Sequence, residues 1–199
     1  EEMQPSDERR DIMVTLARML ETTGNNVGAR ALVEEVLEED PTQIAALKMR
    51  AGWLIEGDRV DEAIVALRSA LGEAPNDAEL MSLMAGAHER AGNRDLMAEM
   101  LSRAVEASNS APGESLRYAR YLIADGNLRT AETVLINALR LDPGNPALLN
   151  GLGEVYLGEQ DWGRLTQVID TLKRQETPAA QRLASDLTAR QLAAQNREE

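Results

Sequence analysis

The sequence predicts an all-α fold in which antiparallel helix pairs stack as an α-solenoid, closed by one carboxy-terminal capping helix. Alanine, leucine, glutamate and arginine dominate the 199 residues, and all four favour helices. Prolines recur in register, since Pro41 and Pro75 are 34 residues apart and Pro75 and Pro143 are twice 34 apart. A fixed period of this length is typical of arrays of small helical repeats.

Phasing the chain on 34 residues gives five units without any insertion or deletion. The units begin at Arg10, Ile44, Ala78, Pro112 and Pro146, giving residues 10–43, 44–77, 78–111, 112–145 and approximately 146–179. The eighth residue of each unit is always small: Ala17, Ala51, Ala85, Ala119 and Gly153. The twenty-fourth is always a branched aliphatic: Val33, Leu67, Leu101, Leu135 and Ile169. Such agreement predicts that every unit has the same structure.

Each unit is expected to form two helices. The fourth, seventh, eighth and eleventh residues share one face of the first helix, and the twentieth, twenty-fourth and twenty-seventh share one face of the second. Small residues at positions eight and twenty let helix axes approach to about 8–10 Å. A glycine at position fourteen or fifteen is expected to end the first helix in a left-handed conformation. These glycines are Gly24, Gly57, Gly92 and Gly126. One pair cannot bury its apolar face alone, so successive pairs must stack.

The stretch NPALLNGLGEVYLGEQDW, residues 145–162, resembles the tetratricopeptide repeat family, whose units begin W-x₂-L-G-x₂-Y. Leu149, Leu152, Gly153 and Tyr156 fill the four places. The resemblance covers residues 10–177, and it implies a right-handed superhelix whose first helices line a concave groove. Departures from the family pattern are Arg50, Met97, Asn109, Ser115, Leu165 and Thr177. The repeats are also similar in style to those of bacterial envelope and exopolysaccharide-export proteins.

The two ends differ from the repeats. Residues 1–9 are predicted to be an acidic flexible lead that is loose up to about Pro5, with Ser6 able to cap the first helix and Asp7 and Glu8 in its first turn. Residues 178–195 are predicted to form a capping helix whose apolar stripe is Leu183, Leu187 and Leu192, and 196–199 a tail. Because the chain starts without methionine, we expect it to be an excised part of a longer protein.

Charge and composition restrict the partners. The net charge is −13, and residues 1–43 alone carry eleven acidic against four basic residues. Such a chain repels phosphate backbones, which argues against nucleic acid. No apolar run of about eighteen residues is present, so direct membrane insertion is not expected. The absence of cysteine excludes disulfides and favours the bacterial periplasm or envelope over the cytoplasm.

Catalytic and metal chemistry find little support in the sequence. His88 is the only histidine, and we expect it to pack in a repeat or at the groove edge. The acidic run at residues 34–40 lacks the alternating ligands of a calcium loop and is expected to face solvent or a partner. No nucleophile elbow or phosphate loop is present. We therefore expect no enzyme activity, metal or cofactor.

The remaining hypothesis is a protein-binding scaffold that holds a partner peptide or helix in the concave groove, within a larger bacterial assembly or export protein. The resemblance places groove residues at the second, fifth, ninth, twelfth and thirteenth positions. The candidates are Val14, Arg18, Lys48, Gly52, Ile55, Ser82, Glu89, Leu116, Arg120, Ile123, Asn150 and Glu154. Two alternatives stay open: a merely solvated inner surface, and a structural self-assembly unit that forms a homodimer through its acidic amino-terminal face.

Overall fold

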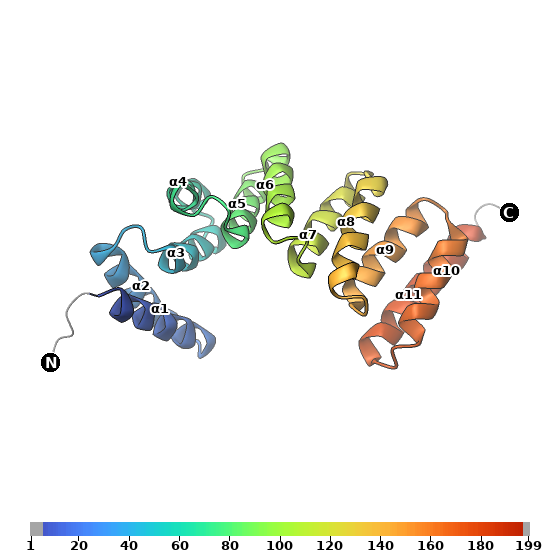
Figure 1. Cartoon of the computed structure of the whole chain (residues 1–199), viewed down its shortest axis with the longest axis horizontal. Coiled ribbons are helices and arrows are strands. Elements are labelled where there is room, and N and C mark those ends of the chain that lie inside the picture. Colours follow the sequence, from blue (N-terminus) through green and yellow to red (C-terminus); the bar gives the residue numbers. More distant parts are fainter. Residues whose placement is uncertain (1–5, 197–199) are drawn as a thin grey trace. The chain divides into compact units, whose positions relative to one another are not determined.

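The computed structural model describes residues 6–196, and within that range it contains eleven α-helices and no β-strand (Figure 1). The predicted all-α fold is confirmed. Residues 1–5 of the predicted lead and 197–199 of the predicted tail lie outside the described part of the chain. The chain divides into two compact units: unit one runs up to Ala104 and unit two begins at Val105.

The helices follow one another with short connections. Unit one contains α1 (Asp7–Thr22), α2 (Asn26–Glu39), α3 (Ile44–Glu56), α4 (Val60–Glu73) and α5 (Ala78–Arg90). The division falls inside α6 (Arg94–Ala107). Unit two contains α7 (Pro112–Ala124), α8 (Leu128–Leu141), α9 (Pro146–Gly158), α10 (Trp162–Lys173) and α11 (Pro178–Gln195).

Within each unit, consecutive helices pair and the pairs stack. In unit one, α1 packs on α2 and α3 on α4, while α3 also contacts α2 and α5 contacts both α3 and α4. In unit two, α7 packs on α8 and α9 on α10, and α9 contacts both α7 and α8. The last helix, α11, packs against α9 and α10. This is the arrangement expected for helix pairs that can bury their apolar faces only against neighbouring pairs.

The columns of the repeat form the cores of the two units. The alanines at the eighth position, Ala17, Ala51, Ala85 and Ala119, are all 0% exposed. The branched aliphatic residues at the twenty-fourth position are at most 3% exposed: Val33, Leu67, Leu101, Leu135 and Ile169. Small residues therefore stand where helix backbones approach, and branched aliphatic residues fill the space beside them.

In each of the five 34-residue repeats, the residue at the fifteenth position, just after the first helix, has a left-handed backbone conformation. These residues are Gly24 (φ 83°), Asp58 (φ 60°), Gly92 (φ 73°), Gly126 (φ 78°) and Gln160 (φ 57°). The expectation for Gly57 is wrong, because its φ is −80° and the left-handed turn passes to Asp58. All five repeats therefore need a positive φ at this position, and glycine provides it in three of them.

The ends also refine the expectations. The first helix begins at Asp7, where Ser6 accepts a hydrogen bond from the Arg9 N–H at 3.2 Å. Residues 7–9 are therefore helical, as expected from the Ser6 cap with Asp7 and Glu8 in the first turn, and they do not belong to the predicted flexible lead. In α11, Leu187 is fully buried, but Leu192 is 56% exposed and lies outside the buried stripe.

Candidate protein-binding surface

Unit one holds seven of the twelve predicted groove residues, and they differ in availability. Val14 is only 3% exposed, so it belongs to the core and offers no surface, contrary to the prediction. The fifth position borders the buried stripe of the first helix, and a branched aliphatic residue there is drawn inward. Arg18 and Glu89 are exposed. The others are half-buried: Lys48, Gly52, Ile55 and Ser82.

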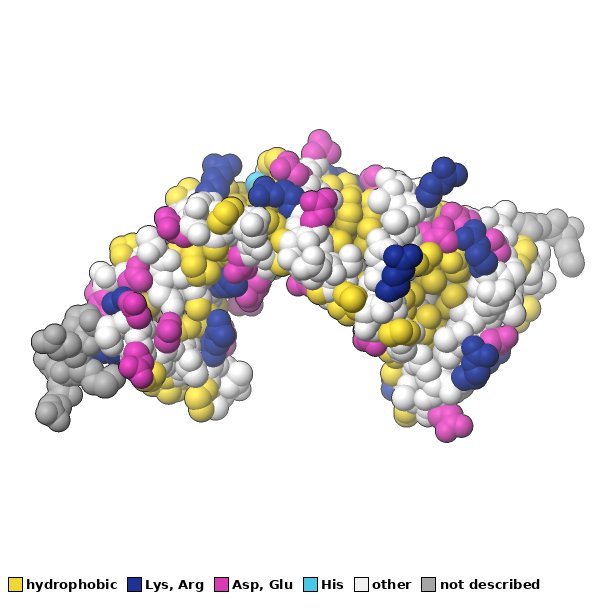
Figure 2. All heavy atoms as spheres, viewed as in Figure 1, with side chains coloured by type: hydrophobic (Ala, Val, Ile, Leu, Met, Phe, Trp, Pro, Cys, Tyr) yellow, Lys and Arg dark blue, Asp and Glu magenta, His cyan; other side chains and the backbone are white. Residues whose placement is uncertain are grey.

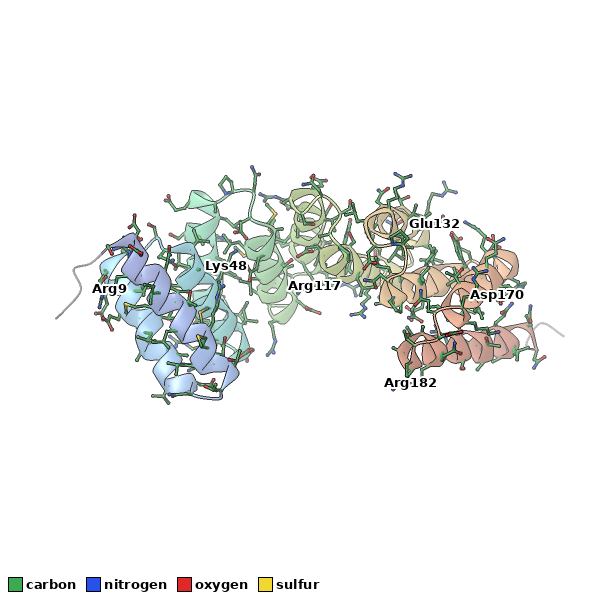
Figure 3. All side chains as sticks on the ribbon, turned by 60° about the horizontal axis from the view of Figure 1, so that its bottom comes forward. Arg9, Lys48, Arg117, Glu132, Asp170 and Arg182 are labelled. Carbon is green, nitrogen blue, oxygen red and sulfur yellow. The ribbon has the colours of Figure 1, made fainter. Side chains whose placement is uncertain are left out.

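Lys48 is engaged within the fold (Figure 3). Its Nζ lies 2.7 Å from Asp77 Oδ2 and 2.7 Å from Glu79 Oε2. Burial opposes the charge on Lys48, but the hydrogen bonds to the two carboxylates outweigh this effect and raise its pKa above the ordinary value. Asp77 also accepts the Leu80 N–H at 2.9 Å as the cap of α5. Lys48 therefore ties α3 to the start of α5.

In unit two, three predicted residues lie on α7. Leu116 and Ile123 are half-buried and pack against the core of this unit. Arg120 is exposed, and among the described residues it makes no ion pair or hydrogen bond. The first helix of this pair thus presents a free guanidinium between two partly exposed aliphatic side chains at helical spacing.

The two candidates on α9 face their own neighbours. The Asn150 Nδ2 donates to Glu154 Oε1 at 3.3 Å, while Asn150 Oδ1 is buried and accepts no hydrogen bond. Glu154 also lies 3.4 Å from Arg190 Nη1 of α11. The capping helix therefore occupies Glu154, and α7 retains the more available surface of this unit.

The acidic run at the end of α2 is largely paired. Arg9 of α1, labelled in Figure 3, forms salt bridges with Glu39 and, at 2.7 Å, with Glu35. Asp40 lies 3.6 Å from Arg10, and Glu34 lies 3.5 Å from Arg50. The four glutamates of this run are exposed, as expected, and three of them also pair with arginines of α1 or α3.

A polar pocket between α2 and α3 was not predicted from the sequence. Trp53 lines this pocket, with the Arg30 guanidinium 5.5 Å from the ring centroid and with Glu21 accepting the indole N–H at 2.5 Å. The pocket encloses about 370 Å³ and is lined by Arg30, Glu34, Arg50, Trp53, Leu54, Gly57 and Arg59. Arg50 and Arg59 already pair with Glu34 and Glu62, so the pocket is a closed network of charges rather than a free cationic site. The only signal in the sequence is the tryptophan at the tenth position of its unit.

A second network joins α8, α9 and α10. The Tyr156 hydroxyl donates to Glu132 at 3.0 Å, and the Arg164 guanidinium lies 4.3 Å above the Tyr156 ring (Figure 3, Glu132 labelled). Burial and the Glu132 contact raise the pKa of Tyr156. Arg164 also binds Asp161 at 2.6 Å and Glu159 at 3.1 Å. Tyr156, the tyrosine of the repeat motif, therefore has a structural role: its ring is buried, and its hydroxyl is hydrogen-bonded to Glu132.

His88 is 6% exposed on α5, as expected for a packed residue. Its Nδ1 has no hydrogen-bond partner, and burial together with nearby Arg68 lowers its pKa, which Glu99 opposes. Across residues 6–196, no group of three acidic, histidine or cysteine side chains is placed to hold a metal ion. None of the described helices has the length and apolar character needed to cross a membrane.

Charges of both signs are interspersed on the face shown in Figure 2, on unit one and on unit two alike. On this face, basic residues do not gather into one large patch.

Comparison with known proteins supports this reading of the repeats. A tetratricopeptide repeat family model matches residues 116–164. The cellulose synthase operon protein C of Pseudomonas fluorescens (strain SBW25) is 24% identical over 172 residues, covering 82% of this chain and 13% of that protein. The chain therefore spans only a small part of the length of this relative.

Solved structures agree in fold. The pilF protein of Pseudomonas aeruginosa has a TM-score of 0.73 and 18% identity, covering 94% of this chain and 89% of that chain. YrrB, described as a TPR protein with an unusual peptide-binding site, has a TM-score of 0.67 and 18% identity, covering 89% and 90%. MamA has a TM-score of 0.64 and 16% identity, and the match covers 92% of this chain and 96% of MamA. The resemblance predicted from the sequence is confirmed: the chain resembles tetratricopeptide-repeat proteins in sequence and in fold, and it is similar to a product of a bacterial cellulose synthase operon.

Proposed function

We propose that this chain is a non-catalytic scaffold that holds a peptide or helix of a partner protein on the first-helix surface of unit two. The observation that carries the proposal is the exposed, unpaired Arg120 between half-buried Leu116 and Ile123 on α7. The aliphatic groups provide apolar area for affinity, and the guanidinium orients a carboxylate or carbonyl group of the partner.

The availability of these side chains favours α7 over three of the other predicted positions. Lys48 is held by two carboxylates, Glu154 is paired with the capping helix, and Val14 is buried. A partner would have to break existing contacts to use the first two residues, and such contacts cost free energy when they are lost. Arg120 requires no such exchange.

The relative supplies the biological setting of the proposal. The similarity of this chain to a cellulose synthase operon protein supports a role in a polysaccharide-synthesis or export assembly of the bacterial envelope. The partner is then another protein of that assembly, and the periplasm is the proposed compartment.

Site-specific photocrosslinking tests the surface directly. A photoreactive amino acid at position 120, on exposed α7 surface, is compared with one at position 133, on exposed α8 surface of the same unit. Crosslinking is done in cells that express the assembly, and the adducts are identified by mass spectrometry. We expect a discrete partner adduct from position 120 and none from position 133. Adducts from position 133 with none from position 120 would show that the first-helix surface is not used.

A further inference from the structure

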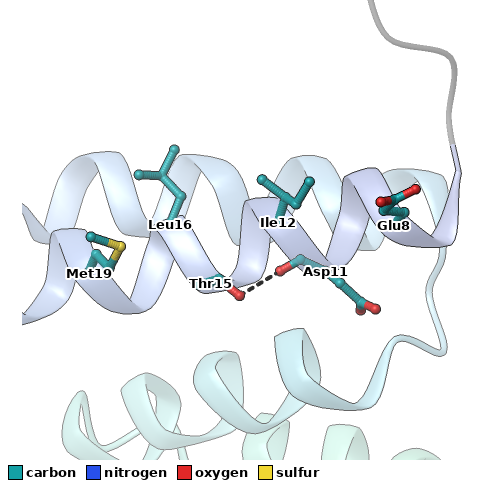
Figure 4. Close-up of a pocket in the computed structure, with 6 residues that line it drawn as sticks. All are labelled: Glu8, Asp11, Ile12, Thr15, Leu16 and Met19. Atoms are coloured by element: carbon teal, nitrogen blue, oxygen red, sulfur yellow. Dashed lines mark hydrogen bonds between the residues drawn. The ribbon is translucent and has the colours of Figure 1, made fainter.

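Unit one has two partly apolar surfaces that the proposed function does not use. On α1, the exposed side chains of Ile12, Leu16 and Met19 help to line a shallow hollow of about 620 Å³ (Figure 4). All residues that line this hollow belong to α1, so no second helix of the described chain provides an opposing wall. The other surface lies on α3, and it has a floor and two walls.

A groove runs along α3 between α2 and α4. Its first part is the polar pocket of about 370 Å³ described above, to which α2 contributes one wall. Its second part is a hollow of about 450 Å³, to which α4 contributes Asp61 and Val65. Arg50 and Leu54 of α3 line both parts, so the two parts are continuous. We call this surface, with α3 as its floor, the α3 groove.

Two large polar residues keep the α3 groove open. The seventh and tenth positions of this repeat are Arg50 and Trp53, and both side chains are half-buried. In α5 the same positions hold Met84 and Ala87, which are 3% and 0% exposed. Arg50 keeps its guanidinium at the surface and Trp53 stacks against Arg30, so the space that Met84 fills in α5 stays open in α3.

The charges of the α3 groove are paired in its middle and free at its two ends. Three arginines and three carboxylates line the groove, so it has no net charge. Within residues 6–196, four of these six side chains form two salt bridges, whereas Arg30 and Asp61 make no ion pair or hydrogen bond. Arg30 lines only the first part of the groove, and Asp61 lines only the second. Because the Arg30 guanidinium stacks over the Trp53 ring, the N–H groups at its edge stay available to a carboxylate.

We propose that the α3 groove binds a short segment of a partner protein in which an aliphatic residue lies between an acidic and a basic residue. The acidic side chain pairs with Arg30, the basic one with Asp61, and the aliphatic one covers Val65, which is 67% exposed. A uniformly anionic partner, such as a nucleic acid or an acidic membrane surface, does not fit, because it meets Asp61 at one end. This site lies in unit one and does not depend on the α7 surface of unit two.

Selection from a phage-displayed library of random peptides on the purified chain tests the proposal. Val65→Arg places a charge in the apolar part of the groove. Val27→Arg is its matched control, because Val27 is 83% exposed on α2 and lines neither part of the groove. Both positions are exposed, so both variants should unfold at the wild-type midpoint. We expect the enriched peptides to carry an aliphatic residue between an acidic and a basic one, and to bind Val65→Arg at least roughly tenfold more weakly than Val27→Arg.

Charge reversal tests how the segment is oriented. Arg30→Glu should weaken binding of a selected peptide roughly tenfold, and replacing the acidic residue of that peptide by lysine should restore the affinity. Arg120→Glu should leave this binding unchanged, so a failure here is distinguishable from a failure of the function proposed for α7. A library without binders, or peptides that bind Val65→Arg and Val27→Arg equally, would overturn the proposal. So would a homodimer, seen by sedimentation, that Val65→Arg dissociates, because the groove would then belong to a second copy.

Discussion

At the residue scale, His88 makes stability depend on pH. It is buried without a partner for Nδ1, and burial with the nearby Arg68 lowers its pKa in the folded state. The unfolded chain, with a histidine pKa of about 6.5, therefore takes up a proton before the folded chain does. The contribution of His88 is fully present above about pH 6.5, and it is lost as the pH falls below that value.

His88→Gln isolates this effect, because glutamine is polar but does not titrate. Between pH 7.5 and pH 5, the wild type should lose free energy of unfolding relative to the variant, at no more than about 1.4 kcal/mol per pH unit. Denaturant unfolding of both proteins across this range measures the difference. A difference that stays constant with pH would contradict the assignment.

Gln160 carries a local strain that glycine would relieve. Its φ of 57° lies in the left-handed region, as do those of Gly92 and Gly126 at the same position of other units. Gln160→Gly should therefore raise the free energy of unfolding by about 1 kcal/mol. Gly126→Ala should lower it by a similar amount. Thermal unfolding of the two variants tests the pair, and shifts of the same sign would refute this explanation.

At the element scale, the distance between paired helices depends on the eighth position. Ala119 of α7 is 0% exposed, whereas Ala124 at the end of the same helix is exposed. Ala119→Leu should overpack the contact and lower the free energy of unfolding by about 1–3 kcal/mol. Ala124→Leu adds the same atoms on the surface and should be nearly neutral. Equal stability of the two variants would mean that the eighth position does not set the spacing.

The helices were predictable from the sequence because the same packing requirement recurs in every repeat. Position eight of each unit must be small wherever helix backbones approach, so Ala51 and Ala85 report a requirement of the fold itself. The left-handed turn was predicted at glycines, but Asp58 and Gln160 adopt it too. Their backbones are held by the helices on both sides, a tertiary constraint that residue type alone does not reveal.

At the scale of the whole molecule, the exposure of a side chain depends on the neighbouring helices, which its position in the repeat does not specify. Leu16 and Met84 share the seventh position, yet Leu16 is 45% exposed and Met84 is 3% exposed, because only the latter is covered. For the same reason, Lys48 and Glu154 looked like groove residues but pair with Asp77 and Arg190. The sequence therefore supplied candidate surface residues, but it could not predict which of them are buried, as Val14 is, or already paired, as Lys48 is.

The most direct measurement of the central claim, that a first-helix surface binds a partner, compares two charge reversals in unit two. Arg120→Glu lies on α7 and Arg129→Glu on α8, and both residues are exposed. Each variant should keep its free energy of unfolding within about 0.5 kcal/mol. Affinity for the segment crosslinked at position 120 is then measured by calorimetry. We predict at least a roughly tenfold loss for Arg120→Glu and almost none for Arg129→Glu. Equal affinities of the two variants, or a greater loss for Arg129→Glu, would contradict the claim.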